Sequence, residues 1–441
     1  MNNGYLVGYG RRDISPKEPV PLMGYGNTIR RISGPVLDPL YATCVAISDA
    51  KGETVLMLGI DATVPSYRGY IQETVGEALG IPAERIVVNV THTHSAPDQD
   101  AKHPGVEPYR ELYKKACVEA CLAAYADRKA ATLFYGSIET EGLNFVRHYR
   151  MDDGSFAGDN FGDWTNHHAV ANATEVDPTM HLLKFVRQDA PDVLVMSWRA
   201  HASITGGSTK PDVSADFVGS VRAYLEEQTG CLFAYWQGCA GNVNPRSRIP
   251  EQDCTRDYLE YGKLLGGFAL KGLDALTEQP EGDIRFEKYV FPARVNHSQD
   301  HLAGKAAEIK AYYSETNDWK GAKEMGAPFG IRTPFMAGGI VKRAAYGPTW
   351  DTTVTALALN DQLAIVAASH EMFDTTGQYV EDHSPFKNTI ALGYTNGQLG
   401  YMPTAYAWWY SCYETDCTRF AAGVAEDIAY EQLCALRRLK A

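Results

Sequence analysis

Two stretches of the sequence each predict a buried strand, a helix and a second buried strand, and this repeated pattern most constrains the fold. In the first stretch, Thr54–Ile60 (TVLMLGI) and Arg85–Val90 (RIVVNV) are short apolar runs rich in β-branched residues. The helical pattern Arg68–Leu79 lies between them and is followed by Gly80, a helix-ending residue. Strands joined in this way form a βαβ unit, so we expect the two strands to be parallel.

The second stretch repeats this order with strands at Asp192–Trp198 and Cys231–Trp236 around a helix at Ala215–Glu227. Further expected elements are two strands, a helical insertion and a closing helix: Leu363–Ala368, Asn388–Gly393, about 299–323, and Phe420–Arg438. No repeat, low-complexity run or linker marks a boundary. We therefore expect one α/β domain over residues 1–441, with mixed central β-sheets flanked by helices.

Charge and composition exclude several classes of function. The 441 residues carry 41 Lys and Arg against 54 Asp and Glu, a net charge of −13. This balance argues against nucleic acid as a partner, because phosphate backbones select basic surfaces. No apolar run approaches a membrane span and the first residues lack a signal-peptide pattern, so we expect a cytoplasmic protein without stable membrane insertion. The nine cysteines contain no CxxC pair, which favours reduced thiols.

Residues of metal-binding type follow several of the expected strands. They are Asp61, His92, His94, His201, Glu371 and Tyr401. In open α/β sheets, ligands bind just beyond the carboxyl ends of the strands. The sequence therefore predicts a site at the carboxyl ends, built from residues far apart in the chain.

The segment Thr91-His92-Thr93-His94 is the first sign of a metal site. Alternate residues of an extended segment share a face, so both imidazoles are expected to point the same way, as a ligand and a neighbouring base. Each residue also has an ordinary interpretation: loop histidines on a polar rim, a core histidine at His201, and a solvated carboxylate at Glu371. Histidine and carboxylate ligands with one open position are typical of catalytic zinc.

The sequence resembles the catalytic domain of the neutral/alkaline (non-lysosomal) ceramidases, a family of zinc amidases. Six blocks occur in the family's order from Gly8 to about Tyr413: GYGRRDISP with Met23-Gly24-Tyr25, Asn89 to Pro97 (NVTHTHSAP), Trp198 to His201 with Ser214-Ala215-Asp216, Gly241 to Pro245 (GNVNP), His370-Glu371, and Asn396 to Glu414. The last block keeps two tyrosines at the family's spacing, Tyr401 and Tyr413. The sequence is similar to a cytosolic, bacterial-type homologue without the family's secretion signal and C-terminal immunoglobulin-like domain.

The resemblance implies one Zn²⁺ per chain, held by His92, His201, Glu371 and Tyr401. It implies three further roles: His94 as general base, Arg147 as a ligand of the substrate carbonyl, and Tyr413 as an oxyanion donor. The expected reaction is cleavage of an amide, in a ceramide-like or smaller N-acyl substrate, by zinc-activated water.

Two departures from the family pattern keep alternatives open. Asn242 and Asn244 replace an Asp and a Ser of the family, and Ala405 to Tyr410 (AYAWWY) replaces an acidic run. One alternative is a zinc hydrolase for an ester, a lactone or a carbohydrate-derived substrate. The other is a degenerate member that keeps the fold as a binding protein. Manganese or iron could occupy such a site, and the oligomeric state is not predicted.

Overall fold

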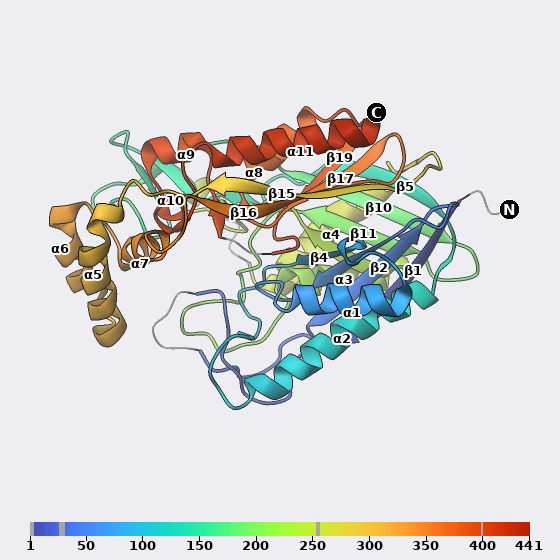
Figure 1. The fold of residues 1–441 in the computed structure, drawn as a ribbon, viewed down its shortest axis with the longest axis horizontal. Helices are drawn as coiled ribbons and strands as arrows, with labels where there is room; N and C mark the ends of the chain where they lie inside the picture. The colour runs from blue at the N-terminus through green and yellow to red at the C-terminus, as the bar shows by residue number, and fades with distance from the viewer. Residues whose placement is uncertain (1–3, 26–30, 253–255, 398–399) are drawn as a thin grey trace.

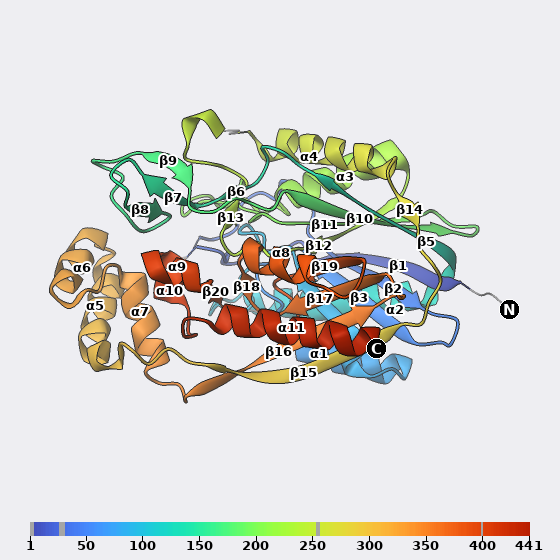
Figure 2. The same cartoon turned by 90° about the horizontal axis from the view of Figure 1, so that it is seen from above.

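The computed structural model describes residues 4–25, 31–252, 256–397 and 400–441. Two main β-sheets pack face to face between two layers of helices (Figures 1 and 2). The strands of the larger sheet are, in spatial order, β12 (Leu232–Gln237), β11 (Val193–Trp198), β10 (Thr179–Arg187), β5 (Lys129–Glu139), β1 (Tyr5–Asp13), β2 (Tyr41–Ser48), β3 (Thr54–Ile60) and β4 (Ile86–Val90), and β14 (Thr277–Glu278) pairs with β5. The strands of the smaller sheet are β15 (Arg285–Arg294), β16 (Thr349–Ala358), β17 (Leu363–Ala368) and β19 (Asn388–Leu392).

Alternation along the strands builds three core layers, because successive side chains point to opposite faces of a sheet. In β3, Leu56 and Leu58 face the core under the outer helices, whereas Met57 faces the smaller sheet. In β17, Ile365 contributes to the core between the sheets, and Val366 packs under the helices on the far side. The helices covering the larger sheet are α1 (Arg68–Leu79), α2 (Val106–Ala126), α3 (Phe217–Thr229) and α4 (Tyr258–Leu273), and those covering the smaller sheet are α8 (Asp374–Asp382) and α11 (Val424–Lys440).

The predicted α/β class with mixed sheets is confirmed. The pairs β3–β4, β11–β12 and β17–β19 are parallel, and the remaining pairs of the two main sheets are antiparallel. The larger sheet also curls until its edge strands meet: Gln237 at the end of β12 donates its backbone N–H to the side chain of Asn89 in β4 at 2.8 Å. This curl brings the ends of β4 and β11 together although the strands stand far apart in the sheet order.

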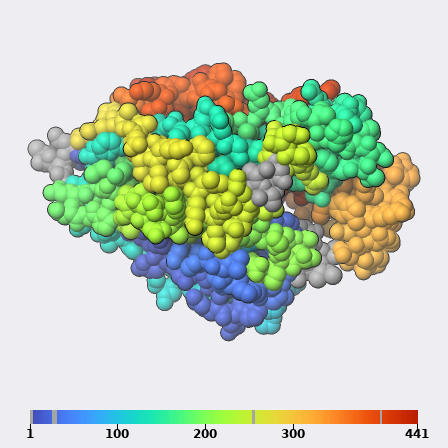
Figure 3. Space-filling model, turned by 180° about the vertical axis from the view of Figure 1, so that it is seen from behind, coloured from blue at the N-terminus to red at the C-terminus, as the bar shows by residue number. Residues whose placement is uncertain are grey.

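A helical segment projects from one end of the smaller sheet, between β15 and β16 (Figures 1 and 3). It consists of α5 (Ala303–Thr316), α6 (Trp319–Gly326) and α7 (Pro334–Arg343), and has a small apolar core that includes Ile309 and Ile340. The three-stranded sheet β8 (Phe156–Gly158), β7 (His148–Met151) and β9 (Ala169–Asn172) lies near this segment. Within the described part of the chain, no helix is long and apolar enough to cross a membrane.

Candidate metal centre and active site

Three buried side chains from distant parts of the chain converge on one point. The Nε2 atoms of His92 and His201 lie 3.3 Å and 3.4 Å from the same oxygen, Oε2 of Glu371. All three side chains are at most 5% exposed. Nitrogen and oxygen ligands of a tetrahedral zinc lie about 2.0–2.1 Å from the ion and therefore about 3.3 Å from one another. The spacing of these atoms fits a zinc site.

Strand ends and short parallel strands position the three side chains. His92 follows β4, His201 follows β11, and Glu371 opens the short strand β18 (Glu371–Met372) after β17. In β18, Glu371 is the register partner of Tyr401 in the parallel strand β20 (Tyr401–Met402). The backbone at Gly241 also packs directly against Glu371. A Cβ at position 241 would lie 2.3 Å from the Glu371 carbonyl oxygen, so only glycine fits there. Asp61, also at a strand end, is paired with Arg222 at 2.7 Å and does not join this group.

Backbone carbonyls fix the orientation of His92 and His201. Nδ1 of His92 lies 2.7 Å from the carbonyl oxygen of Thr63, and Nδ1 of His201 lies 3.0 Å from that of Val243. A carbonyl only accepts, so each Nδ1 carries the proton and each Nε2 presents a lone pair toward Glu371. This arrangement is typical of metal-binding histidines, whose second nitrogen donates to a carbonyl or carboxylate. The donor set therefore fits a divalent cation in chemistry as well as in spacing.

His94 lies beside these ligands, with its Nε2 atom 3.2 Å from Nε2 of His92. Its backbone N–H donates to the carbonyl of Ala202 at 2.9 Å, and its ring stands edge-on to Tyr25 at 5.1 Å between ring centres. Gly24 allows this packing, since a Cβ there would lie 2.7 Å from His94. Among the described residues, Nδ1 of His94 has no hydrogen-bond partner.

The two histidines of the HxH segment are brought together in a different way from the predicted one. We expected an extended segment in which alternate side chains share a face. That expectation is wrong, because β4 ends at Val90 and His92 adopts a left-handed backbone with φ 57°. The rings of His92 and His94 nevertheless lie 4.8 Å apart, at 77° to each other. A turn after the strand, not strand alternation, makes them converge.

Two further predicted residues, Arg147 and Tyr413, lie around the ring of Tyr401. The guanidinium carbon of Arg147 lies 5.4 Å from the centre of the Tyr401 ring, and the rings of Tyr401 and Tyr413 are 5.7 Å apart. Arg147 follows the short strand β6 (Phe145–Val146), and Tyr413 opens α10 (Tyr413–Cys417). The structure thus connects, through direct contacts, all seven residues to which the family resemblance assigned a role as ligand or catalytic group.

Burial and neighbouring charge set the protonation of the group. Burial lowers the pKa of His94 well below its usual value, and the nearby imidazoles of His92 and His201 lower it further. Burial alone would raise the pKa of Glu371, but His92 and His201 outweigh it and hold that pKa below its usual range. Burial, followed by Glu371, raises the pKa of Tyr401 well above its usual value. An ionised carboxylate beside a neutral imidazole suits a cation, which would also lower the pKa of a bound phenol.

Sequence reasoning missed a buried network behind Arg147. Glu414 accepts from Nε of Arg147 at 2.8 Å, and its other oxygen lies 2.8 Å from Nε2 of His148. Nδ1 of His148 lies 2.7 Å from the Tyr410 hydroxyl. Burial alone would lower the pKa of Arg147, but Glu414 and Tyr401 outweigh burial and raise that pKa well above its usual value. His148 is held by Tyr410 and in turn holds Glu414, and Glu414 orients the guanidinium of Arg147. Only the position of Glu414 next to Tyr413 hinted at it in the sequence.

Tyr394 is a second residue that the sequence did not single out. It is fully buried, adopts φ 52°, and its ring centre lies 4.4 Å from that of His92. Its hydroxyl has no hydrogen-bond partner within the described ranges. The ring therefore forms one wall of the histidine cluster.

The two asparagines that depart from the family pattern have structural partners. Asn242 donates its amide to Asp374 Oδ1 at 2.7 Å and accepts from the backbone N–H of Asp374 at 2.9 Å. Asn244 donates to Asp159 at 3.1 Å. An amide, which can donate, is therefore the group that the buried carboxylate of Asp374 requires at position 242.

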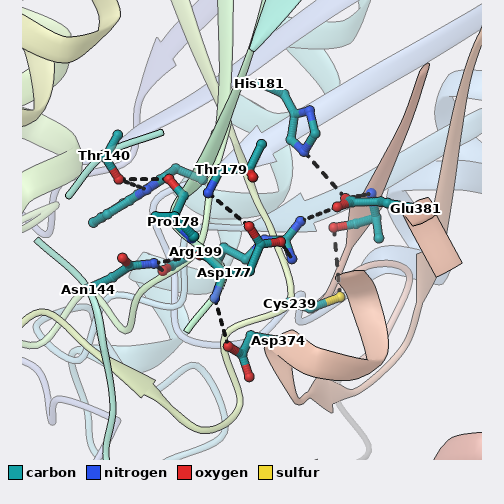
Figure 4. A network of polar contacts seen from close by, with 12 residues as sticks. Thr140, Asn144, Asp177, Pro178, Thr179, His181, Arg199, Cys239, Asp374 and Glu381 are labelled. Atoms are coloured by element: carbon teal, nitrogen blue, oxygen red, sulfur yellow. Dashed lines mark hydrogen bonds and ion pairs between the residues drawn. The ribbon is translucent and has the colours of Figure 1, made fainter. Parts of the chain in front are cut away.

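A second charged network holds the strand that leads to His201 (Figure 4). Arg199, fully buried, pairs with Asp177 and, at 2.6 Å, with Glu381 of α8. The other oxygen of Asp374 accepts from the backbone N–H of Asp177 at 3.2 Å. The end of β11 is thereby tied to the helix layer over the smaller sheet.

Comparison with known proteins gives the fold a name. No family model matches the chain, and no curated protein matches it by sequence. A crystal structure of neutral ceramidase from Pseudomonas aeruginosa superposes with a TM-score of 0.74 and 16% identity, over 100% of this chain and 75% of that chain. A structure of a ceramidase complexed with C2 gives a TM-score of 0.72, again at 16% identity, over 99% and 75% of the two chains. Two packed sheets, two helix layers and these superpositions together show that the chain has the fold of the neutral ceramidase catalytic domain.

Proposed function

We propose that this protein is a zinc-dependent hydrolase that cleaves a linear amide, with residues 1–441 acting as one catalytic domain. The observation that carries the proposal is the convergence of His92, His201 and Glu371 at tetrahedral ligand spacing beside His94. Tyr401, the register partner of Glu371, is the proposed fourth ligand. A zinc ion bound there would polarise the substrate carbonyl and lower the pKa of the attacking water.

His94 is the proposed general base. Its low pKa keeps the ring neutral near pH 7, so it is able to accept a proton from the attacking water. The protonated ring then donates to the leaving nitrogen, which is a poor leaving group until it is protonated. Gly24 and the carbonyl of Ala202 hold His94 in place for both transfers.

Arg147 and Tyr413 are the proposed donors to the substrate oxygen. Glu414 holds the Arg147 guanidinium on the Tyr401 side of the site, and Tyr413 stands edge-on to Tyr401. Both donors are fixed before the substrate arrives, so they stabilise a developing negative charge without reorganisation. Removal of one such donor costs about 3 kcal/mol in the transition state.

The substrate proposed is an N-acyl amide, ceramide-like or smaller, because the fold matches proteins described as ceramidases. The alternative substrates, an ester or a lactone, need the same donors but no protonation of a leaving amine. Hydrolysis of an amide should therefore depend on His94 more strongly than hydrolysis of an ester or a lactone, and this difference distinguishes the two substrate classes. The cytoplasmic location stays a prediction.

A matched pair of substrates tests the proposal. The purified protein, with and without chelator and then with zinc restored, is assayed on an N-acyl amide and on the ester of the same acyl group. We expect zinc-dependent turnover of the amide, and a larger loss on the amide than on the ester for His94→Gln. Turnover of the ester alone would favour the alternative substrate class. Absence of turnover in zinc-loaded protein across both classes would contradict an enzymatic function.

A further inference from the structure

A cavity of about 600 Å³ opens between the three-stranded sheet and the helical segment. One wall comes from the loops after β8, including Phe161 and Trp164, and the opposite wall from α6 and the turn that follows it. Figure 3 shows a hollow between the green surface of β7–β9 and the orange surface of α5–α7. The zinc ligands do not line this cavity, so it is separate from the metal centre.

The charged residues of the cavity all have the same sign. Arg248, Lys323 and Arg332 line it, and none of its described lining residues is acidic. Arg248 is paired with Asp159 at 3.2 Å, and Arg332 with Asp416 at 2.6 Å. Lys323 has no ion pair with any residue that the structure describes. Of the three cations, Lys323 is thus the one without a carboxylate of the described residues at ion-pair distance, in a protein whose net charge is −13.

Aromatic side chains supply the apolar part of the cavity wall. Phe161, Trp164 and Trp319 all line it. Arg248 lies over the Trp164 ring, with its guanidinium carbon 4.6 Å from the ring centre. This contact and the ion pair to Asp159 fix the guanidinium at the cavity wall. Cations held beside aromatic faces suit a ligand that has both an apolar body and an anionic group.

A chain of aromatic contacts connects the cavity to the proposed active site. Trp319 in the cavity wall contacts Phe335 at 5.2 Å between ring centres, and Phe335 contacts Tyr413 at 5.7 Å. Tyr413 in turn contacts Tyr401. Arg332 also donates to the carbonyl of Ser411, two residues before Tyr413. Two ring contacts therefore separate the cavity wall from Tyr413, the residue proposed to bind the substrate oxygen.

We propose that this cavity binds an anionic group carried by the substrate, on the portion that extends past Tyr413. The preferred substrate class is then an N-acyl amide that bears a carboxylate, sulfonate or phosphate, such as an N-acyl amino acid, in place of a neutral lipid amide. This inference rests on the proposed function, which it makes more specific. Lys323, which has no ion pair with a described residue, supplies one donor, and Arg248 supplies a second donor on the opposite wall.

A pair of probes with the same acyl chain tests this inference: N-dodecanoyl-taurine, which carries a sulfonate, and the neutral N-dodecanoyl-ethanolamine. The variant is Lys323→Gln, and the matched control is Lys320→Gln on the same helix, because Lys320 is exposed and does not line the cavity. We expect Lys323→Gln to lower kcat/KM for the sulfonate about tenfold relative to the neutral amide, the effect of one lost charge-assisted hydrogen bond. The control leaves the ratio unchanged. An unchanged ratio in Lys323→Gln overturns the inference and leaves the hydrolase proposal intact.

Equilibrium binding provides a readout that does not depend on turnover. Calorimetric titration of N-dodecanoyl-taurine into the full-length protein should give a Kd about tenfold weaker for Lys323→Gln than for wild type. That result supports an anion site even if neither amide is hydrolysed. Equal affinity of wild type and Lys323→Gln, or equal affinity of wild type for both probes, would contradict it. Arg248→Gln should show the same selective loss, with folding checked by circular dichroism.

Discussion

Asn89 joins the two edges of the large sheet by hydrogen bonds to the backbone of Gln237. Its Oδ1 accepts from the Gln237 N–H at 2.8 Å, and its Nδ2 donates to the Gln237 carbonyl at 3.3 Å. The same Nδ2 lies 2.9 Å from the carbonyl of Gly393 and 3.0 Å from Oγ1 of Thr395. One amide thereby links β4, which leads to His92 of the proposed metal centre, to β12 and to the segment after β19.

Replacement of Asn89 by alanine should destabilise the fold markedly. The change leaves the buried backbone N–H and carbonyl of Gln237 without their partner, which costs about 3 kcal/mol in total. The Gly393 carbonyl still accepts from the Thr395 hydroxyl. Urea unfolding of Asn89→Ala and of the exposed control Asn166→Ala measures the difference. A loss below about 1 kcal/mol for Asn89→Ala would mean that the sheet edges meet without this amide.

His94→Gln separates a base from a ligand. Nε2 of His94 lies 3.2 Å from Nε2 of His92, which is the spacing expected between two ligands of one metal ion, so geometry alone allows either role. As a base, His94 should be dispensable for metal binding, and its loss should lower kcat about 10²–10⁴-fold. Metal content and kcat of the variant are compared with those of His103→Gln. Loss of the metal in His94→Gln would assign His94 as a ligand.

The two asparagines of the GNVNP segment give a matched pair for electrostatics. Asn242→Asp places a second carboxylate against the buried Asp374, whose own pKa burial already raises. Two adjacent carboxylates do not both ionise readily, so we expect about 2 kcal/mol lower stability at pH 7 and a smaller loss near pH 5. Asn244→Asp faces the more exposed Asp159 and should cost less than about 1 kcal/mol. Urea midpoints at the two pH values check this, and equal losses for the two variants would refute it.

The sequence predicted the buried parallel strands well because their signal is local. Thr54–Ile60 is a strand with the predicted bounds, and Arg68–Leu79 is the predicted helix. The predicted first residues of helices were less accurate, because the backbone conformation of the preceding residue determines where a helix begins. The helix expected from Ala215 begins at Phe217, after Asp216 at φ 60°, and the closing helix begins at Val424, after Gly423 at φ 86°.

Long-range features were beyond sequence reasoning. The curl of the large sheet depends on Asn89 and Gln237, which lie 148 residues apart. The contact between Arg147 and Glu414 spans 267 residues. Neither pair leaves a spacing signal in one sequence. His201 and Glu371, by contrast, each follow an expected strand, so the strand-end rule predicted that they lie near each other.

Glu381 should contribute stability that is lost in acid. Burial would raise its pKa, but Arg199 and His181 outweigh it and lower the pKa to about 2. The folded-state pKa is below the unfolded value of about 4.3, so the stabilisation is present above about pH 5 and disappears as the pH falls toward 2. We expect Glu381→Gln to lose about 3 kcal/mol at pH 7, and this deficit to shrink with acidification.

Urea unfolding of wild type and Glu381→Gln between pH 7 and pH 3 measures that deficit. Glu278→Gln, at an exposed position of β14, is the control. A deficit that is independent of pH would show that Glu381 acts through packing and not through its charge.

Metal content tests the central claim most directly. Wild type, His92→Ala and the exposed control His168→Ala are purified without added zinc and examined by elemental analysis, with folding checked by circular dichroism. The account predicts about one zinc ion per chain in wild type and in His168→Ala, and little in folded His92→Ala. Folded wild type that binds no divalent metal even after incubation with zinc, or equal zinc in wild type and His92→Ala, would contradict it.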